Sequence, residues 1–192
     1  MTAVAHYGSV ATELAICRKT AGLADRSELG RLELTGREPW IEHALAHAIG
    51  PGVPRPGRAA RLGDTWCCRV APDRALIVAP APALARWRRL AREAVVAGHP
   101  IACADVSDAT TAASLVGPSA AAVLRLAGMP YGPEVGDLAA GEDVIVLRDG
   151  PQQFLVLAGA PIWDALLDAG RPLGLSPVGS DAIVRLRAVA PR

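Results

Sequence analysis

The order of apolar and polar residues along the chain predicts alternating strands and helices. Residues 31–35 (RLELT) alternate polar and apolar side chains, as a half-buried strand does, and residues 111–116 (TAASLV) repeat this pattern more weakly. A helix is predicted after each of these strands, at residues 38–50 and 118–128, because a proline stands near the start and a glycine at the end of each segment.

Further along each part of the chain, paired apolar runs predict a hairpin. WCCRV and ALIVA form the first pair, and VIVL and FLVLA form the second; each pair is separated by a turn with proline and an acidic residue or glycine. Helices are predicted at residues 82–98 and 161–170, and the run AIVRLRAV (Ala182 to Val189) predicts a last strand.

Two further segments complete this reading. A helix is predicted from Ser9, with Ser9 or Thr12 as its cap, to a stop at Gly22, and it should pack across the first half of the chain. Residues 51–63 (PGVPRPGRAARLG) are rich in proline, glycine and arginine, and they predict a long irregular loop.

The chain repeats one plan at an interval of about eighty residues. The stretch ADRSELGRLELTG, at residues 24–36, matches ADVSDATTAASLVG at residues 104–117. PDRALIVAPAP likewise matches PQQFLVLAGAP, and a tryptophan follows each, Trp87 in the first case and Trp163 in the second. Self-similarity at a fixed interval is the sequence signature of a repeated architecture.

The repeat predicts two halves, residues 1–99 with the N-terminal helix and residues 100–192. Strand, helix, two strands, helix and strand is the ferredoxin-like order, an α+β layer with helices on one face of a mainly antiparallel sheet. The fold class is therefore α+β, with two pseudo-repeated ferredoxin-like halves and no C-terminal barrel.

Composition excludes several classes of function. The chain has 192 residues, 51% of them hydrophobic, and a net charge of +1 from 20 basic and 19 acidic side chains. A balanced charge argues against nucleic acid and anionic membranes as partners. No long uncharged apolar run and no leader pattern at the N-terminus is present, so we expect a cytoplasmic protein.

Cysteine and histidine spacing predicts no metal site. The four cysteines form no CxxC pair, and the adjacent Cys67 and Cys68 should point to opposite faces of a strand, so reduced and packed thiols are expected. His43 and His47 lie four apart on a predicted helix, but no third ligand is indicated. Histidines at the surface or its boundary are the expectation.

Three stretches resemble the glycine-cleavage T-protein (aminomethyltransferase) superfamily. Glu13 followed by CRKTAGLADRSELGRLELTG is similar to the N-terminal signature of that family, and WDALLDAGRPLGLSPVGSDAIVRLR (Trp163 to Arg187) is similar to its C-terminal signature. ADVSDATTAASLVGPSAAAVL resembles the middle signature, so the match occurs in the right order over about half of the chain.

Departures from the family pattern qualify this resemblance. Full-length aminomethyltransferases are roughly twice this long, and their pterin-binding glutamate has no counterpart in RDGPQQFLV (Arg148 to Val156). Near the C-terminus Ile183 and Val184 stand where the family has arginine and aspartate. The short length and the WCCRVAPDRALIV stretch resemble the gamma subunit of heterotetrameric sarcosine oxidase.

The resemblance implies a tetrahydrofolate-linked protein of one-carbon transfer, a subunit or accessory of an amine-oxidising or one-carbon enzyme complex. Its partners would be a reduced folate and either a protein subunit or a second copy. The alternative is a non-catalytic interaction subunit that kept the fold and lost the folate pocket. Whether the chain is itself an enzyme stays open at this stage.

Three residues are candidates for the site that the resemblance implies. Asp64 is the nearest match to the family's aspartate beside the reacting nitrogen, where a carboxylate can stabilise developing positive charge; the alternative is a solvated turn aspartate. Trp66, at a strand start beside Asp64, is a candidate for lining a pocket. Arg187 is retained from the C-terminal signature, and we assign it with Trp66 to cofactor binding.

Two other patterns favour a structural interpretation. Asp25 with Ser27, and Asp105 with Ser107, predict turns in which short side chains accept hydrogen bonds from backbone N–H groups. The arginines of RWRRLAR, at residues 86–92, form either a solvated basic helix face or a surface that docks an acidic partner or polyglutamyl tail.

Overall fold

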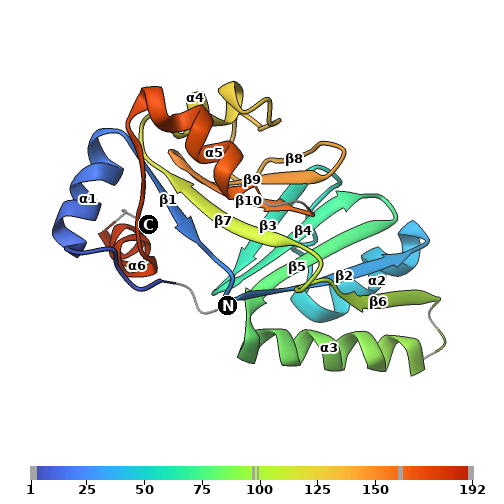
Figure 1. Ribbon diagram of the computed structural model, residues 1–192. Helices are drawn as coiled ribbons and strands as arrows, with labels where there is room; N and C mark the ends of the chain where they lie inside the picture. Colours follow the sequence, from blue (N-terminus) through green and yellow to red (C-terminus); the bar gives the residue numbers. More distant parts are fainter. Residues whose placement is uncertain (1–3, 97, 99, 160–161, 190–192) are drawn as a thin grey trace. The chain divides into compact units, whose positions relative to one another are not determined.

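The computed structural model describes residues 4–96, 98, 100–159 and 162–189. The chain divides into two compact units, each built from segments that are distant in the sequence (Figure 1). The first unit comprises the chain up to Ser27, Thr110–Val135 and the chain from Ala139 onward; the second comprises Glu28–Ala109 and Gly136–Leu138. No described helix is both long enough and apolar enough to cross a membrane.

The second unit contains a five-stranded antiparallel sheet in the order β3-β4-β5-β2-β6. Its strands are β2 (Leu29–Gly36), β3 (Arg58–Leu62), β4 (Thr65–Ala71), β5 (Arg74–Pro80) and β6 (Ile101–Asp105). Helices α2 (Glu38–Ile49) and α3 (Ala81–Val96) cover one face, where Ile41, Leu45, Leu84 and Trp87 pack on Ile77. This arrangement is ferredoxin-like, as the sequence predicts.

The first unit contains a six-stranded sheet in the order β11-β1-β7-β10-β9-β8. Its strands are β1 (Ala21–Asp25), β7 (Thr111–Val116), β8 (Leu138–Ala140), β9 (Val144–Gly150), β10 (Gln153–Ala158) and β11 (Leu175–Pro177). Its helices are α1 (Val10–Lys19), α4 (Ala120–Leu126), α5 (Trp163–Gly170), the 3-10 turn η1 (Arg171–Leu173) and α6 (Ser180–Val189).

Helices cover this sheet on both faces at the strand β1. Leu23 belongs to the core cluster that includes Leu124 of α4 and Leu166 of α5. Its neighbour Ala24 belongs to a separate cluster with Cys17 of α1 and Ile183 of α6. Because successive side chains of a strand point to opposite faces, α4 and α5 lie on one face and α1 and α6 lie on the other.

The two units exchange one strand of the sequence repeat. β1 precedes β2 in the chain but pairs with β7, and β6 precedes β7 but pairs with β2. In one sheet β7, from the second half of the sequence, therefore lies beside β1 from the first half. In the other sheet β2, from the first half, lies beside β6 from the second half. The two halves inferred from the repeat, residues 1–99 and 100–192, stay a prediction. The compact units have different boundaries, because these depend on which strands pair.

Three predicted elements are wrong in type or extent. Ala182–Val189 is not a strand, because it lies in helix α6, where Ala182, Ile183 and Leu186 form one apolar helical face against α1 and β1. The predicted loop at residues 51–63 contains β3, which pairs with β4. Helix α1 ends at Lys19 without a side-chain cap from Ser9, and Gly22 lies inside β1.

Candidate functional site

The candidate carboxylate, Asp64, lies at the tip of the β3–β4 hairpin. Gly63 and Asp64 form a two-residue turn between the paired residues Leu62 and Thr65, and Gly63 has a φ of 59°, which glycine adopts without strain. The Asp64 side chain is exposed and makes no hydrogen bond or ion pair to the residues that the structure describes. This placement agrees with a solvated turn aspartate.

Trp66 is packed inside the sheet of the second unit. Its side chain is only 7% exposed and lies on the face of the sheet opposite α2 and α3, next to Val78 on β5. The guanidinium carbon of Arg61 lies 5.4 Å from the Trp66 ring centroid, and Arg61 Nε donates a hydrogen bond of 3.0 Å to the Gly63 carbonyl. One face of the indole is therefore covered by an arginine of the same hairpin.

Arg61 is the residue near the candidate site that sequence reasoning missed. The signal for it was the Gly63–Asp64 pair, because a two-residue turn sets the register of a hairpin and places Arg61 directly opposite Trp66. Because residues 51–63 were predicted to form an irregular loop, this register was not recognised from the sequence.

The hairpin tip can offer an anion at Asp64 and a cation at Arg61 to a ligand. A carboxylate stabilises positive charge strongly only where water is excluded, since the interaction in bulk water is weaker by about an order of magnitude. Asp64 is exposed in this chain, so any catalytic use of it requires a second molecule that covers the tip.

Arg187 lies in α6, which belongs to the first unit, whereas Asp64 and Trp66 belong to the second. The side chain of Arg187 lies outside the described part of the structure. Its assignment to cofactor binding stays a prediction, as do those of Asp64 and Trp66.

Arg148 lies on β9, at the start of the stretch RDGPQQFLV, which contains no glutamate. The Arg148 guanidinium donates to the carbonyls of Pro133 and Pro151, the latter at 2.6 Å, and lies 5.6 Å from the Phe154 ring centroid. An arginine held by backbone carbonyls stabilises the hairpin. Its guanidinium has only donor groups and offers no acceptor atom to a ligand.

Residues of the three signature stretches have structural roles. Glu13 is 4% exposed, and its two carboxylate oxygens accept hydrogen bonds from the backbone N–H groups of Tyr7 at 2.6 Å and Gly179 at 2.8 Å. Gly117 has a φ of 130°, and a Cβ there would lie 2.5 Å from the Thr20 carbonyl oxygen. These residues join distant segments of the first unit.

The two predicted aspartate–serine turns are confirmed. Ser27 N–H donates to Asp25 Oδ1 at 2.9 Å, and Ser107 N–H donates to Asp105 Oδ1 at 3.0 Å. The Ser107 hydroxyl also donates to Asp105, which lowers the pKa of that carboxyl below its ordinary value of 3.8. Both pairs shape the turn between two strands.

Histidine and cysteine side chains provide no metal site among the described residues, which contain no cluster of three potential ligands. His43 and His47 are exposed on α2. Cys67 and Cys68 are both buried, and burial raises the pKa of Cys67 to about 12 and that of Cys17 to about 11. Buried thiols with raised pKa values are poor nucleophiles at neutral pH.

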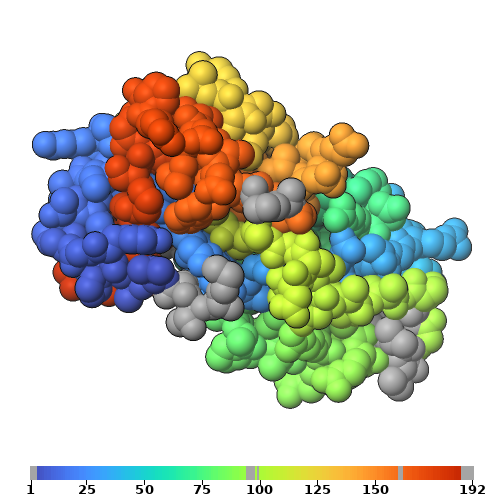
Figure 2. Space-filling view, in the orientation of Figure 1, coloured from blue at the N-terminus to red at the C-terminus, as the bar shows by residue number. Residues whose placement is uncertain are grey.

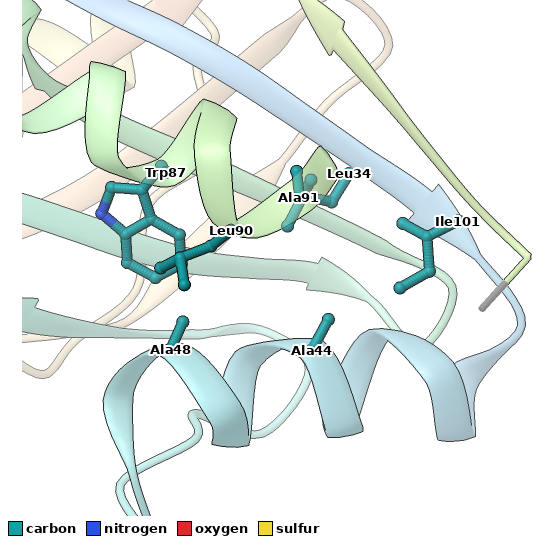
Figure 3. A pocket seen from close by; sticks show the side chains of 7 residues that line it. All are labelled: Leu34, Ala44, Ala48, Trp87, Leu90, Ala91 and Ile101. Atoms are coloured by element: carbon teal, nitrogen blue, oxygen red, sulfur yellow. The ribbon is translucent and has the colours of Figure 1, made fainter. Parts of the chain in front are cut away.

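A small apolar hollow lies between α2 and α3 (Figure 3). Its volume of about 20 Å³ has room for about one water molecule, whereas a folate-sized ligand needs several hundred Å³. Its walls are apolar side chains, among them Ala44, Ala48, Trp87 and Ile101, and none of the candidate site residues lines it. The hollow is a packing gap between two helices.

Comparison with known proteins identifies the fold. Neither the family models nor the curated proteins match this sequence. Among solved structures, the glycine cleavage system aminomethyltransferase T from Bartonella henselae is 22% identical with a TM-score of 0.76; the match covers 93% of this chain and 53% of that one. This chain therefore spans about half the length of that aminomethyltransferase.

A second solved structure matches over nearly its full length. A chain of the heterotetrameric sarcosine oxidase from Corynebacterium sp. U-96, in complex with pyrrole 2-carboxylate, is 25% identical with a TM-score of 0.67. The match covers 87% of this chain and 93% of that one. The chain therefore has the α+β fold of the aminomethyltransferase folate-binding domain, which these two proteins also contain.

Proposed function

We propose that this chain is a tetrahydrofolate-linked protein of one-carbon transfer that acts as a subunit of an amine-oxidising or one-carbon enzyme complex. The observation that carries the proposal is the match to a chain of a heterotetrameric sarcosine oxidase, because it covers 93% of a chain of nearly the same extent.

Asp64 is assigned the catalytic role in this proposal, and Trp66 and Arg187 are assigned to the folate. The carboxylate of Asp64 would stabilise the positive charge that develops on the amine nitrogen as the one-carbon unit moves to the folate. Trp66 would line the folate site, and its contact with Arg61 fixes the indole at the base of the tip.

The test is calorimetric titration with tetrahydrofolate under anaerobic, reducing conditions. It is carried out first on the chain alone and then on the complex that an affinity-tagged chain recovers from its native host. We expect binding in the complex, and an Asp64→Asn variant whose transfer rate falls by about 10²-fold while folate affinity stays the same. Absence of binding in both samples would contradict the proposal.

Asp73→Asn is the matched control, because Asp73 is an exposed aspartate in the β4–β5 turn of the same unit. It should leave both the folate affinity and the transfer rate unchanged. Equal losses in the two variants would indicate a general electrostatic effect and remove Asp64 from the catalytic role.

A second candidate function is that of a non-catalytic interaction subunit. The absence of a glutamate from RDGPQQFLV (Arg148 to Val156), the stretch that corresponds to the family's pterin-binding motif, favours it. In that case the recovered complex binds no folate, and Asp64→Asn leaves its activity unchanged. Recovery of the intact complex with the Asp64→Asn chain would then show that Asp64 is not needed for assembly.

A further inference from the structure

Strand β6 forms an open edge of the five-stranded sheet. Ile101 is buried, but the four residues that follow it, Ala102 to Asp105, are all exposed, and among the described residues β6 pairs with β2 alone. The opposite edge, β3, is partly covered, because Ala59 N–H donates to the Gly136 carbonyl at 2.8 Å. An uncovered edge strand offers a row of backbone donors and acceptors to another chain.

The direction of these backbone groups follows from the register. Val106 N–H donates to the Arg31 carbonyl at 2.9 Å, and β6 continues in register with β2 without a bulge. Because backbone groups alternate along an antiparallel strand, those of Ala102 and Ala104 point toward β2, whereas those of Cys103 point outward.

The sequence repeat shows what fits at this edge. β1 is the equivalent of β6, eighty residues earlier, and β11 pairs in parallel along its corresponding edge, with Leu23 opposite Pro177. The carbonyl of Leu23, the equivalent of Cys103, accepts a hydrogen bond of 2.9 Å from Val178 N–H. The chain thus fills this edge in one unit and leaves it open in the other.

Helix α3 places positive charge beside the open edge. It carries four arginines and one glutamate, and all five side chains are exposed. Arg88 contacts Asp105 at the end of β6, and Arg92 lies one helical turn further along the same flank. In Figure 2 the green helix α3 and the yellow-green strand β6 lie next to each other at the surface.

We propose that the outer edge of β6 binds an extended acidic segment of a partner protein, which adds to the sheet as β11 adds to β1. The outward N–H and C=O of Cys103 bind its backbone, and Arg92 binds a carboxylate of the segment, since Arg88 is already paired with Asp105. A nucleic acid cannot satisfy the strand edge. A second copy, paired two-fold through β6, would bring the arginines of both α3 helices together. This inference does not depend on folate binding.

The experiment measures binding of a labelled, blocked peptide in which threonine and glutamate alternate, using fluorescence anisotropy and the full chain. Cys103→Pro removes the outward N–H without touching the ladder to β2 and should weaken binding at least tenfold, whereas Cys103→Ser should bind normally. Arg92→Glu should also weaken binding about tenfold. Arg171→Glu, which changes an exposed arginine of the other unit, is its control.

Several outcomes would overturn the proposal. These are equal binding of a threonine–lysine peptide, unchanged binding to Cys103→Pro, tighter binding of an oligonucleotide, or dimerisation of the free chain through β6 detected by light scattering. Circular dichroism checks that Cys103→Pro is folded. If it is not, Arg92→Glu decides the test, because this exposed side chain can change without loss of the fold. Folate titration in parallel distinguishes failure here from failure of the proposed function.

Discussion

β1 and β6 are the same strand of the sequence repeat in two different environments. β1 lies between β11 and β7, and its first four residues are buried; β6 lies at the edge of its sheet, and its last four residues are exposed. Both strands end in the same aspartate–serine turn. The comparison teaches that the repeat conserves the turn and the register, whereas burial depends on which segments pack around the strand.

The largest difference between the two strands is expected at the equivalent residues Leu23 and Cys103. Leu23→Ala should reduce the free energy of unfolding by about 3 kcal/mol, because Leu23 is fully buried and a cavity would remain. Cys103→Ala should change it by less than about 0.5 kcal/mol, since Cys103 is exposed. Urea denaturation measures both; similar losses would show that β6 is covered in solution.

A second pair adds volume instead of removing it. A Cβ at Gly22 would lie 2.5 Å from Cys17 Sγ and 2.8 Å from Val178 Cγ2, so Gly22→Val should cost about 2–3 kcal/mol. The equivalent change Ala102→Val, at an exposed position, should be close to neutral. Urea midpoints of the two variants test this, and a neutral Gly22→Val would contradict the packing of α1 on β1.

Thiol labelling compares the strands without a mutation. In the native protein at about pH 8, Cys103 should react with a disulfide reagent because its thiol is exposed, although partial desolvation raises its pKa too. Cys17 and Cys67 should not react, because they are buried and burial raises the pKa of Cys17 to about 11 and that of Cys67 to about 12. All four cysteines should react after denaturation. Native labelling of Cys17 beneath β1 would show that the α1–α6 layer opens readily.

The smallest effect concerns acid stability at the turn after β6. The hydrogen bond from the Ser107 hydroxyl is the main cause of the lowered pKa of Asp105, so the ionised carboxylate stabilises the fold above its ordinary pKa of 3.8. This contribution is lost as the pH falls through the lowered pKa. Asp105→Asn should therefore lose less stability than the wild type between about pH 5 and about pH 2, by a small amount at this exposed site. If the variant and the wild type lose the same amount of stability over this pH range in acid unfolding experiments, the Asp105 carboxylate has no such stabilising role.

Local chemistry explains the part of the fold that was predicted from the sequence. The alternation in β2, the helix α2 between Pro39 and Gly50, and the β4–β5 hairpin follow from periodicity and turn residues, which act over a few positions. The two aspartate–serine turns were predicted for the same reason. The strands β1 and β6 before these turns were not predicted, because AGLAD and IACAD carry little alternation of their own.

The candidate site was only partly predictable. Asp64 and Trp66 were identified from the family resemblance, but the cover that Arg61 forms over Trp66 depends on the register of a hairpin that was read as a loop. The absence of a glutamate from RDGPQQFLV could be read from the sequence. The hydrogen bonds of Arg148 to Pro133 and Pro151 depend on a segment distant in sequence as well as on its own turn.

The sequence by itself determined that the chain repeats an α+β plan, where most helices and turns fall, and which family it resembles, because each of these depends on residues that are close together in the chain. Only the tertiary structure decided that β1 and β6 exchange sheets, that Ala182–Val189 is a helix, and that β6 has an open edge. The physical reason is that strand pairing and burial join residues far apart in sequence, and the same short apolar run can form a helix or a strand until its neighbours are in place.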